Sequence, residues 1–502
     1  MSLVKKLAGE TAIYGLSSIL GRVVNWVVLT PYLTRVFDTS AYGIISDLYF
    51  WIALLLVFFT YRMETAFFRF ASRAKEEQSD ANTVFTTASL SIMATTVFFA
   101  VVLLMLAPQV AAWLEYPDRS DYVRIFSLIV AFDALAAVPF ARLRMDSRPM
   151  RFAFIKLSAI VINIAFLFLF LEGLPWASEQ GLPWAERIYQ PDDRIAFVFR
   201  SNLLASTCVL LLLSSLYYKI TWRFAKDVWQ RMLRYSLPLV LAALAGIVNQ
   251  LVGTPLLKEL GPGTTTENLE LAGLYTAAAK LAVLMNLFVQ AFNYAAEPFF
   301  FRQSAVSQDR AIYADVARAF AMVGSLAFLG IMLYLDVIQY FLGASFREGL
   351  GILPILLVAN FFLGLYYNFS IGYKLSDQTK WAGYIALVGS VITLVVNILF
   401  IPSLTIYAPA WASLGCFFSM SVAGYWLTRK LWPVDYRLDK MAYYLLTVLA
   451  AWGLSLAVGQ YLALSMVVNL LVNTVILAAV LGVWYYTERD WLFTTLGLRR
   501  KE

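Results

Sequence analysis

Apolar segments long enough to cross a membrane recur along the whole chain. Of its 502 residues, 61% are hydrophobic and 14% are charged, whereas a soluble protein has roughly 25% charged residues. Crossing a hydrocarbon core of about 30 Å takes about 20 helical residues. By that measure about fourteen segments are present, centred near residues 24, 53, 97, 132, 161, 206, 245, 284, 323, 362, 391, 418, 452 and 476. The sequence therefore predicts an all-α, polytopic membrane protein without room for a soluble catalytic domain.

Histidine is absent from the sequence, which removes the commonest general base and metal ligand. Cys208 and Cys416 both lie inside apolar segments, where we expect them to be small packing residues. We therefore expect neither a metal nor another cofactor. A coupling ion, H⁺ or Na⁺, is left open.

The distribution of basic residues predicts the orientation of the chain. If the N-terminus, with Lys5 and Lys6, is cytoplasmic, then most of the 39 lysines and arginines fall on the cytoplasmic side of the predicted spans. Cytoplasmic loops carry such an excess. We expect a multi-pass protein of the bacterial cytoplasmic (inner) membrane with both termini in the cytoplasm.

One motif occurs twice and indicates an internal duplication. Residues 61–69 and 294–302 share the pattern Y-x-x-E-x-x-F-F-R, and the same gapless offset aligns Asp47 with Lys280. A chance match in a Phe-rich chain is the alternative. Two similar halves in a membrane protein commonly move a substrate through the space between them. An even number of helices per copy predicts parallel repeats.

The duplication predicts four regions. We expect an N lobe of six helices at 1–220 and a C lobe of six helices at 234–432. An amphipathic cytoplasmic linker at 221–233, with Trp222 and Trp229, would lie on the membrane surface as a helix. Residues 433–502 would form two extra C-terminal helices and a tail.

A polar stripe runs along the first apolar segment. At the helical period, Tyr14, Ser18 and Asn25 share the face of Arg22. Arg22 lies near the middle of the predicted span, where a charge is costly and usually faces a cavity. Its forked guanidinium suits a phosphate group. The alternative is a structural ion pair, for example with Asp47.

The duplication brings Asp47 and Lys280 to matching depths in the two halves. We predict that the two residues form a gate by pairing across the central cleft when its outer mouth closes. Two unrelated local pairs are the alternative. Glu64 and Glu297 would sit at the cytoplasmic ends of helices, where the helix dipole disfavours a carboxylate. Each should therefore have a basic partner, either in the gate or in a structural loop clamp.

Further polar residues in apolar segments are candidates for lining a cavity. Asp133 lies between one and two helical turns before Pro139, and its alternative role is a local pair with a neighbouring helix. Asn286, Gln290 and Asn293 form a stripe with Glu297. Amides in such stripes also join helices by hydrogen bonds, which is the alternative here.

Several stretches together resemble a known family. They are residues 12–22, 41–43, 64–70, 139–144 and 148–149. The chain resembles the polysaccharide biosynthesis and oligosaccharide flippase proteins of the multidrug/oligosaccharidyl-lipid/polysaccharide (MOP) exporter superfamily. This resemblance implies two lobes of six helices and alternating access. It also implies that an undecaprenyl-pyrophosphate-linked oligosaccharide moves from the cytoplasmic to the outer leaflet.

The resemblance further implies a role for buried basic residues. In related lipid II flippases, basic residues on helices 1, 2 and 8 serve the pyrophosphate. Arg22 and Lys280 match helices 1 and 8 here, whereas helix 2 offers Asp47, a departure that puts lipid II itself in doubt as the substrate. The implied partners are the lipid-linked oligosaccharide, membrane lipid and pathway enzymes such as a glycan polymerase or glycosyltransferases, with no nucleic acid.

Two other functions compete with this interpretation. A cation-coupled small-molecule exporter of the same superfamily would be favoured by twelve helices and acidic residues deep in the N lobe. A membrane-embedded glycan polymerase or ligase would need an accessible acid/base group. The sequence, without histidine or clustered carboxylates, argues against such an enzyme.

Overall fold

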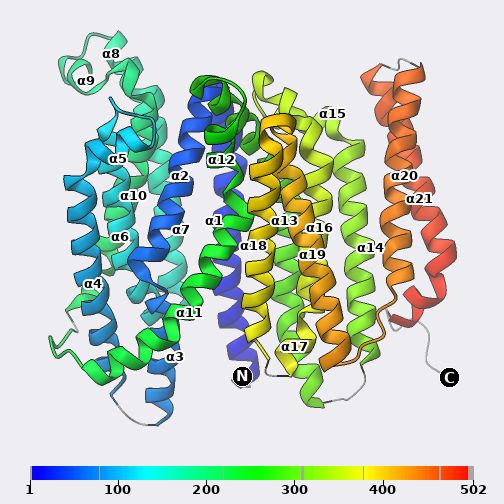
Figure 1. The fold of residues 1–502 in the computed structure, drawn as a ribbon, viewed down its shortest axis with the longest axis horizontal. Helices are drawn as coiled ribbons and strands as arrows, with labels where there is room; N and C mark the ends of the chain where they lie inside the picture. The colour runs from blue at the N-terminus through cyan, green and yellow to red at the C-terminus, as the bar shows by residue number, and fades with distance from the viewer. Residues whose placement is uncertain are drawn as a thin grey trace. The chain divides into compact units, whose positions relative to one another are not determined.

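The computed structural model describes residues 3–77, 80–218, 220–306, 310–376, 378–462 and 465–495. Side chains are described from residue 20 onward, except at 192, 298, 301–306, 492 and 494–495. Within these residues the chain is built from helices joined by short connections, and no strand is present (Figure 1). Lipid offers no partner for backbone groups, so a spanning segment pairs its own N–H and C=O groups in a helix.

The predicted apolar segments all lie within long helices. In the first half of the chain these are α1 (Leu3–Val36), α2 (Thr39–Thr60), α4 (Ala81–Met105), α6 (Ser120–Met145), α7 (Pro149–Phe168), α10 (Arg194–Tyr217) and α11 (Lys226–Leu251). In the second half they are α13 (Thr265–Val306), α14 (Ala311–Leu333), α16 (Leu353–Phe369), α18 (Lys380–Leu404), α19 (Tyr407–Leu431), α20 (Leu438–Leu462) and α21 (Met466–Thr495). Among the described residues, 12 helical stretches are long and apolar enough to cross a membrane. The prediction of a polytopic, all-α membrane protein is confirmed.

Short helices complete the chain. They include α3 (Met63–Glu76), α5 (Ala107–Trp113), α8 (Leu174–Glu179), α9 (Pro183–Ile188), α12 (Gly253–Leu260), α15 (Leu335–Ile338) and α17 (Ile371–Leu375). A 3-10 segment, η4 (Ala344–Ile352), leads into α16.

The chain divides into two compact units. Unit 1 holds residues 1–33, 40–259 and 263–273, and unit 2 holds 34–39, 260–262 and 274–502. Helices α11 and α12, which the duplication assigns to the second half, therefore group with unit 1. The last residues of α1 group with unit 2. The lobe boundaries at residues 220 and 234 stay a prediction, because the compact units follow contacts and not the repeat.

Aromatic side chains fill the interior of each unit. Phe59, Phe67, Phe85, Phe126, Phe197 and Phe199 are fully buried in unit 1. Unit 2 buries Tyr313, Phe320, Phe328, Tyr373, Tyr444 and Trp484. Other large apolar side chains remain exposed along the helices, among them Val97, Phe98, Val161, Leu211, Val391, Leu399 and Leu471. These exposed residues suit contact with lipid tails.

The helix that carries the first copy of the repeated motif is interrupted. Tyr61 and Arg62 have φ values of 33° and 59°, which end α2 and begin α3. Glu64 therefore lies in the first turn of α3, where the helix dipole favours a carboxylate. The expectation of a helix C-terminus at Glu64 was wrong. In the second copy the helix continues, and Glu297 lies within α13.

The segment expected to form a surface helix also differs. Residues 220–225 are not helical, and Trp222 has a φ of 56° with an exposed ring. Trp229 lies in the first turn of α11, and its indole Nε1 donates to Ser91 Oγ at 2.7 Å. The two tryptophans therefore do not share one surface helix, because α11 begins only at Lys226.

Candidate functional site

Two basic side chains from different helices are neighbours inside unit 1. A Cβ at Gly21 would lie 2.6 Å from Cδ1 of Ile160, so α1 and α7 approach closely at this point. Arg22 follows Gly21, and Lys156 precedes Ile160 by one helical turn. The side chains of Arg22 and Lys156 are both exposed, although their helices are largely apolar. An accessible charge within an apolar helix usually marks a functional cavity.

Lys156 is surrounded by other charged and aromatic groups. Its ammonium lies 4.2 Å from the ring centroid of Phe140 on α6. The charges of Asp133, Arg144 and Arg22 all act on this ammonium. Three cations and one carboxylate therefore lie along α1, α6 and α7, giving the group a net positive charge. This arrangement can hold an anionic group.

Asp133 and Asn25 are the other predicted residues of this region whose side chains the structure describes. Asp133 accepts a hydrogen bond from Ser206 of α10 at 2.8 Å. Asn25 has a buried Oδ1 with no hydrogen-bond partner, one turn from Arg22. A buried acceptor without a partner is destabilising unless a ligand donates to it. The side chains of Tyr14 and Ser18 lie outside the described residues.

Asp47 belongs to a second, fully buried cluster. Its carboxylate accepts a hydrogen bond from the Tyr116 hydroxyl at 2.9 Å and lies 3.6 Å from the ammonium of Lys258. The side chains of Asp47 and Lys258 are 0% and 1% exposed. Burial, followed by the charge of Asp47, raises the pKa of Tyr116, which keeps the hydroxyl protonated as a donor.

Lys258 joins α12 to three other segments of unit 1. It donates to the backbone oxygen of Leu114 at 2.6 Å and lies 3.3 Å from Glu259. Asn268 of α13 donates to the backbone oxygen of Lys258 at 3.0 Å. The ion pair and these hydrogen bonds fasten α2, the α5–α6 connection, α12 and the start of α13 together.

Lys280 is half-buried in α13 and belongs to unit 2, whereas Asp47 belongs to unit 1. The Asp47–Lys280 gate therefore stays a prediction. Asp47 already has a cationic partner in its own compact unit, but that partner, Lys258, lies in the second predicted half, so the pair is neither the predicted gate nor a pair within one half.

The two repeated glutamates have different partners. Glu64 lies 3.4 Å from Arg62, the residue that ends α2. Glu297 accepts a hydrogen bond from Lys374 of α17 at 2.7 Å. Each carboxylate therefore has a basic partner within its own unit, but neither partner is among the arginines expected from the sequence, which were Arg142, Arg144, Arg148, Arg302 and Arg310.

The amide stripe on α13 connects helices within unit 2. Asn286 donates to Asn360 of α16 at 3.1 Å, and Gln290 donates to Asn286 on the same helix. Asn293 is half-buried on the same stripe. Asn286 therefore joins α13 to α16 by a hydrogen bond, which is the alternative role given above for the amide stripe.

Three lysines in these contacts were not predicted from the sequence: Lys156, Lys258 and Lys374. Lys156 had a detectable signal, because it is the one basic residue in a long apolar run after Arg151. Lys258 lies in a polar stretch that gives no sign of burial. No group of three or more potential ligand residues that could hold a metal ion occurs among the described residues.

Comparison with known proteins identifies the family. A family model described as "Polysaccharide biosynthesis protein" matches residues 7–304, more than half of the chain. The chain belongs to the polysaccharide biosynthesis protein family. No curated protein matches the sequence.

Solved structures show which fold this polysaccharide biosynthesis protein shares. One match is the lipid II flippase MurJ in an inward closed conformation, with a TM-score of 0.68 and 13% identity, covering 95% of this chain and 99% of MurJ. Another is an inward-facing multidrug resistance MATE family transporter of the MOP superfamily, with a TM-score of 0.59 and 14% identity. That match covers 86% of this chain and 96% of the transporter. The family member therefore has the MOP superfamily fold.

Proposed function

We propose that this protein is a flippase that moves an undecaprenyl-pyrophosphate-linked oligosaccharide from the cytoplasmic to the outer leaflet. Family membership supports a place in polysaccharide biosynthesis. The fold shared with a lipid II flippase supports movement of a lipid-linked substrate. Alternating access between two lobes would carry the polar part of the substrate across the membrane.

The neighbouring exposed cations Arg22 and Lys156 are the observation that carries this proposal. A pyrophosphate is a compact anion that needs cations where lipid excludes water. Arg22 offers a planar fork that binds two oxygens, and Lys156 offers a point charge. The unpaired Oδ1 of Asn25 suits a hydroxyl donor such as that of a sugar.

Glycan export and ligand binding together test the proposal. Farnesyl pyrophosphate serves as a short polyprenyl pyrophosphate for binding to the purified protein. Arg22→Ala and Lys156→Gln should each weaken binding by about tenfold or more, since a hydrogen bond to a charged group is lost. Arg22→Lys should recover only part of the loss, because a point charge replaces the fork. Cells carrying Arg22→Ala should lose glycan export while the protein still inserts.

Arg151→Gln is a matched control on the same helix as Lys156. Arg151 donates to Ser215 and to the backbone oxygen of Leu212, both on α10. Its loss removes one positive charge from α7 without touching the Arg22–Lys156 neighbourhood, so binding should stay within about twofold of the wild type. Normal export by Arg22→Ala at native expression would refute the assignment of Arg22.

Asp133 supports a second candidate function, a cation-coupled small-molecule exporter. It is a carboxylate within the helices of unit 1, and the MATE transporters share the fold. Under this alternative, Asp133→Asn would abolish drug export driven by H⁺ or Na⁺ in vesicles. Under the flippase proposal, the wild-type protein should not export drugs in this assay. Glycan export should be normal only when Arg22 is intact.

A further inference from the structure

A cavity of about 680 Å³ lies in unit 2 between the ends of two helix groups. One wall comes from the end of α14, from α15 and from the start of α16, and the other from α20 and α21. Its apolar lining includes Met332, Leu333, Leu335, Pro354, Trp452 and Leu456. Its polar lining is Asp336, Gln339, Ser455, Gln460, Asn469 and Asn473. The cavity therefore has an apolar part and a polar part.

The polar part has a distinctive chemistry, because its lining contains a carboxylate and amides but no lysine or arginine. Asn469 donates to the Asp336 carboxylate at 2.8 Å, which leaves further lone pairs of that carboxylate for a ligand. The Oδ1 atom of Asn469 is buried and has no hydrogen-bond partner. The cavity offers acceptors and negative charge, so it suits a group that donates hydrogen bonds.

Two buried residues hold this polar wall in place. Asn473 is 2% exposed; it donates to the backbone oxygen of Leu333 at 2.7 Å and accepts from Ser455 at 2.5 Å. Its two hydrogen bonds join α14, α20 and α21 at the cavity. Asp336 and Asn469 therefore line the cavity beside a braced wall, as a binding site needs.

The position along the helices indicates the kind of ligand. The cavity lies at the ends of α14 and α20 and at the start of α21, far along each helix from Arg318 and Lys440. Basic residues gather at the cytoplasmic ends of spanning helices, so the orientation predicted from the sequence places the cavity at the outer end. A membrane lipid has one apolar and one polar part, as does the lining of this cavity.

We propose that this cavity binds the head group of an outer-leaflet lipid that donates hydrogen bonds. An ammonium, as in phosphatidylethanolamine, and a sugar hydroxyl, as in a glycolipid, share this chemistry. The Asp336 carboxylate and the Asn469 oxygen accept from the head group, and the apolar lining contacts the upper acyl chain. An anionic head group without donors is disfavoured, because no cation lines the cavity. This site is separate from the Arg22–Lys156 neighbourhood and does not depend on the proposed transport.

Native mass spectrometry of the purified protein with single lipids tests the proposal. Dioleoyl phosphatidylethanolamine and its mono-, di- and trimethylated forms differ in the number of N–H donors but keep the acyl chains. Retention should fall with each methyl group, by about tenfold or more between the first and last lipid. Equal retention of all four would overturn the proposal, because the cavity would then recognise only acyl chains. This series needs no variant and is therefore independent of folding.

Variants and a second lipid distinguish the two sources of donors. A dioleoyl glucosyl glycerol supplies hydroxyl donors without phosphate or ammonium. If the ammonium is the ligand, Asp336→Asn should remove the preference for phosphatidylethanolamine, and the glycolipid should be retained no better than the trimethylated lipid. If hydroxyls are the ligand, the glycolipid should be retained best, and Asn469→Leu should lower its retention.

Asp439→Asn is the matched control for loss of one carboxylate. Asp439 lies at the opposite end of α20, where it is exposed and pairs with Arg437 at 3.2 Å. This variant should retain every lipid like the wild type. A retention pattern that neither Asp336→Asn nor Asn469→Leu changes would place the lipid elsewhere and refute the site.

Discussion

At the scale of single residues, the most consequential contacts are buried ion pairs. Asp47 and Lys258 are almost completely shielded from solvent, so each needs the other or a set of hydrogen bonds. Lys258 also has the Leu114 oxygen and Glu259 nearby, whereas the Asp47 carboxylate has only Tyr116 and Lys258 as described partners. The two residues should therefore respond differently to substitution.

Lys258→Met should lower the free energy of unfolding by about 3–5 kcal/mol, because it leaves a buried carboxylate without its cation. Asp47→Asn should have a smaller effect, since the asparagine can still accept from Tyr116. The double variant should recover much of the stability that Lys258→Met loses. Thermal unfolding of the purified protein in one detergent would measure all three. A Lys258→Met protein as stable as the wild type would contradict the assigned pair.

At the scale of secondary-structure elements, close helix contacts depend on glycine. A Cβ at Gly43 of α2 would lie 2.0 Å from the backbone oxygen of Leu269, near the start of α13. A backbone atom cannot move aside as the end of a side chain can. The approach of α2 to α13 therefore excludes any side chain at this position.

Gly43→Ala should destabilise the protein by about 1–3 kcal/mol or more, because the methyl group forces the two helices apart. Gly246→Ala is the control: it lies within α11, and a Cβ there meets no atom within 4 Å. Alanine favours the helix, so Gly246→Ala should raise stability by about 0.5–1 kcal/mol. Thermal unfolding would compare them. Equal effects of the two changes would show that the α2–α13 contact is looser than described.

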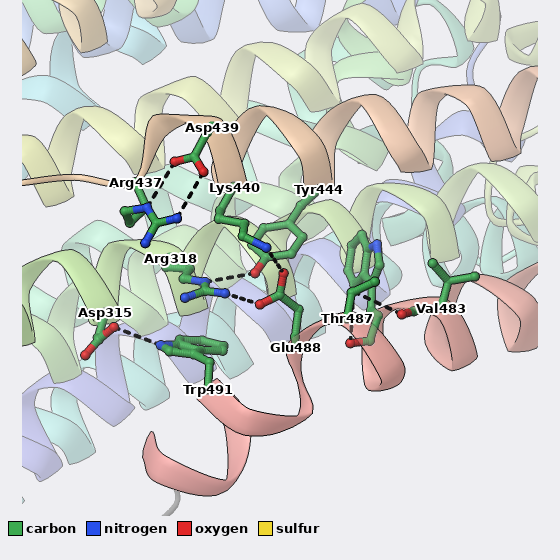
Figure 2. A network of polar contacts seen from close by, with 11 residues as sticks. Asp315, Arg318, Arg437, Asp439, Lys440, Tyr444, Val483, Thr487, Glu488 and Trp491 are labelled. Carbon is green, nitrogen blue, oxygen red and sulfur yellow. Dashed lines mark hydrogen bonds and ion pairs between the residues drawn. The ribbon is translucent and has the colours of Figure 1, made fainter.

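At the end of unit 2 opposite the cavity, one buried carboxylate fastens the last two helices to α14. Glu488 of α21 is 1% exposed and pairs with Arg318 of α14 and with Lys440 of α20, the latter at 2.9 Å (Figure 2). Tyr444 accepts from Arg318 at 3.0 Å, and Trp491 donates to Asp315 at 2.8 Å. Three helices therefore share one network at this end of unit 2.

Glu488→Gln should loosen α20 and α21, because two cations lose their shared counter-charge. Hydrogen–deuterium exchange should accelerate in both helices and in the first turns of α14, while α4 of unit 1 keeps its rate. Asp439→Asn removes an exposed carboxylate close to this network and should leave exchange unchanged. Unaltered exchange in Glu488→Gln would mean that the other contacts, including the Asn473 hydrogen bonds and apolar packing, suffice to hold the C-terminal helices.

At the scale of the whole molecule, orientation is the first property to test. Reporter fusions after residues 219 and 440 should report a cytoplasmic location, and fusions near Gly181 and Gly263 an external one. The reason is the excess of basic residues expected in cytoplasmic loops. A reversed pattern would overturn both the orientation and the parallel repeat.

The gate prediction also belongs to this scale. Cysteines at positions 47 and 280 should crosslink when the outer mouth is closed, and the charge-swapped pair Asp47→Lys with Lys280→Asp should recover transport that either single change loses. Lys258 offers Asp47 a competing partner in unit 1, and the cysteine at position 47 removes that pair, so the crosslink reports only how near the two positions come. Absence of crosslinking in every condition, together with a charge swap that recovers nothing, would refute the gate.

The sequence by itself determined the membrane class, the helices and the family resemblance. Each apolar segment must pair its own backbone groups in lipid, so hydropathy alone located the helices. The expected helix boundary was wrong at the first copy of the repeated motif. Arg62 has a left-handed backbone conformation that ends α2, so Glu64 lies in the first turn of α3. Nothing in the surrounding residues of a single sequence signals that break.

Only the tertiary structure decided which charges meet. Lys156 became a neighbour of Arg22 because Gly21 lets α7 approach α1, and Lys258 reached Asp47 because α12 folds into unit 1. These partners lie far apart in the chain, and the burial of a polar stretch depends on what packs over it. The sequence can predict that a buried charge needs a partner. Only the packing of the helices decides which residue that partner is.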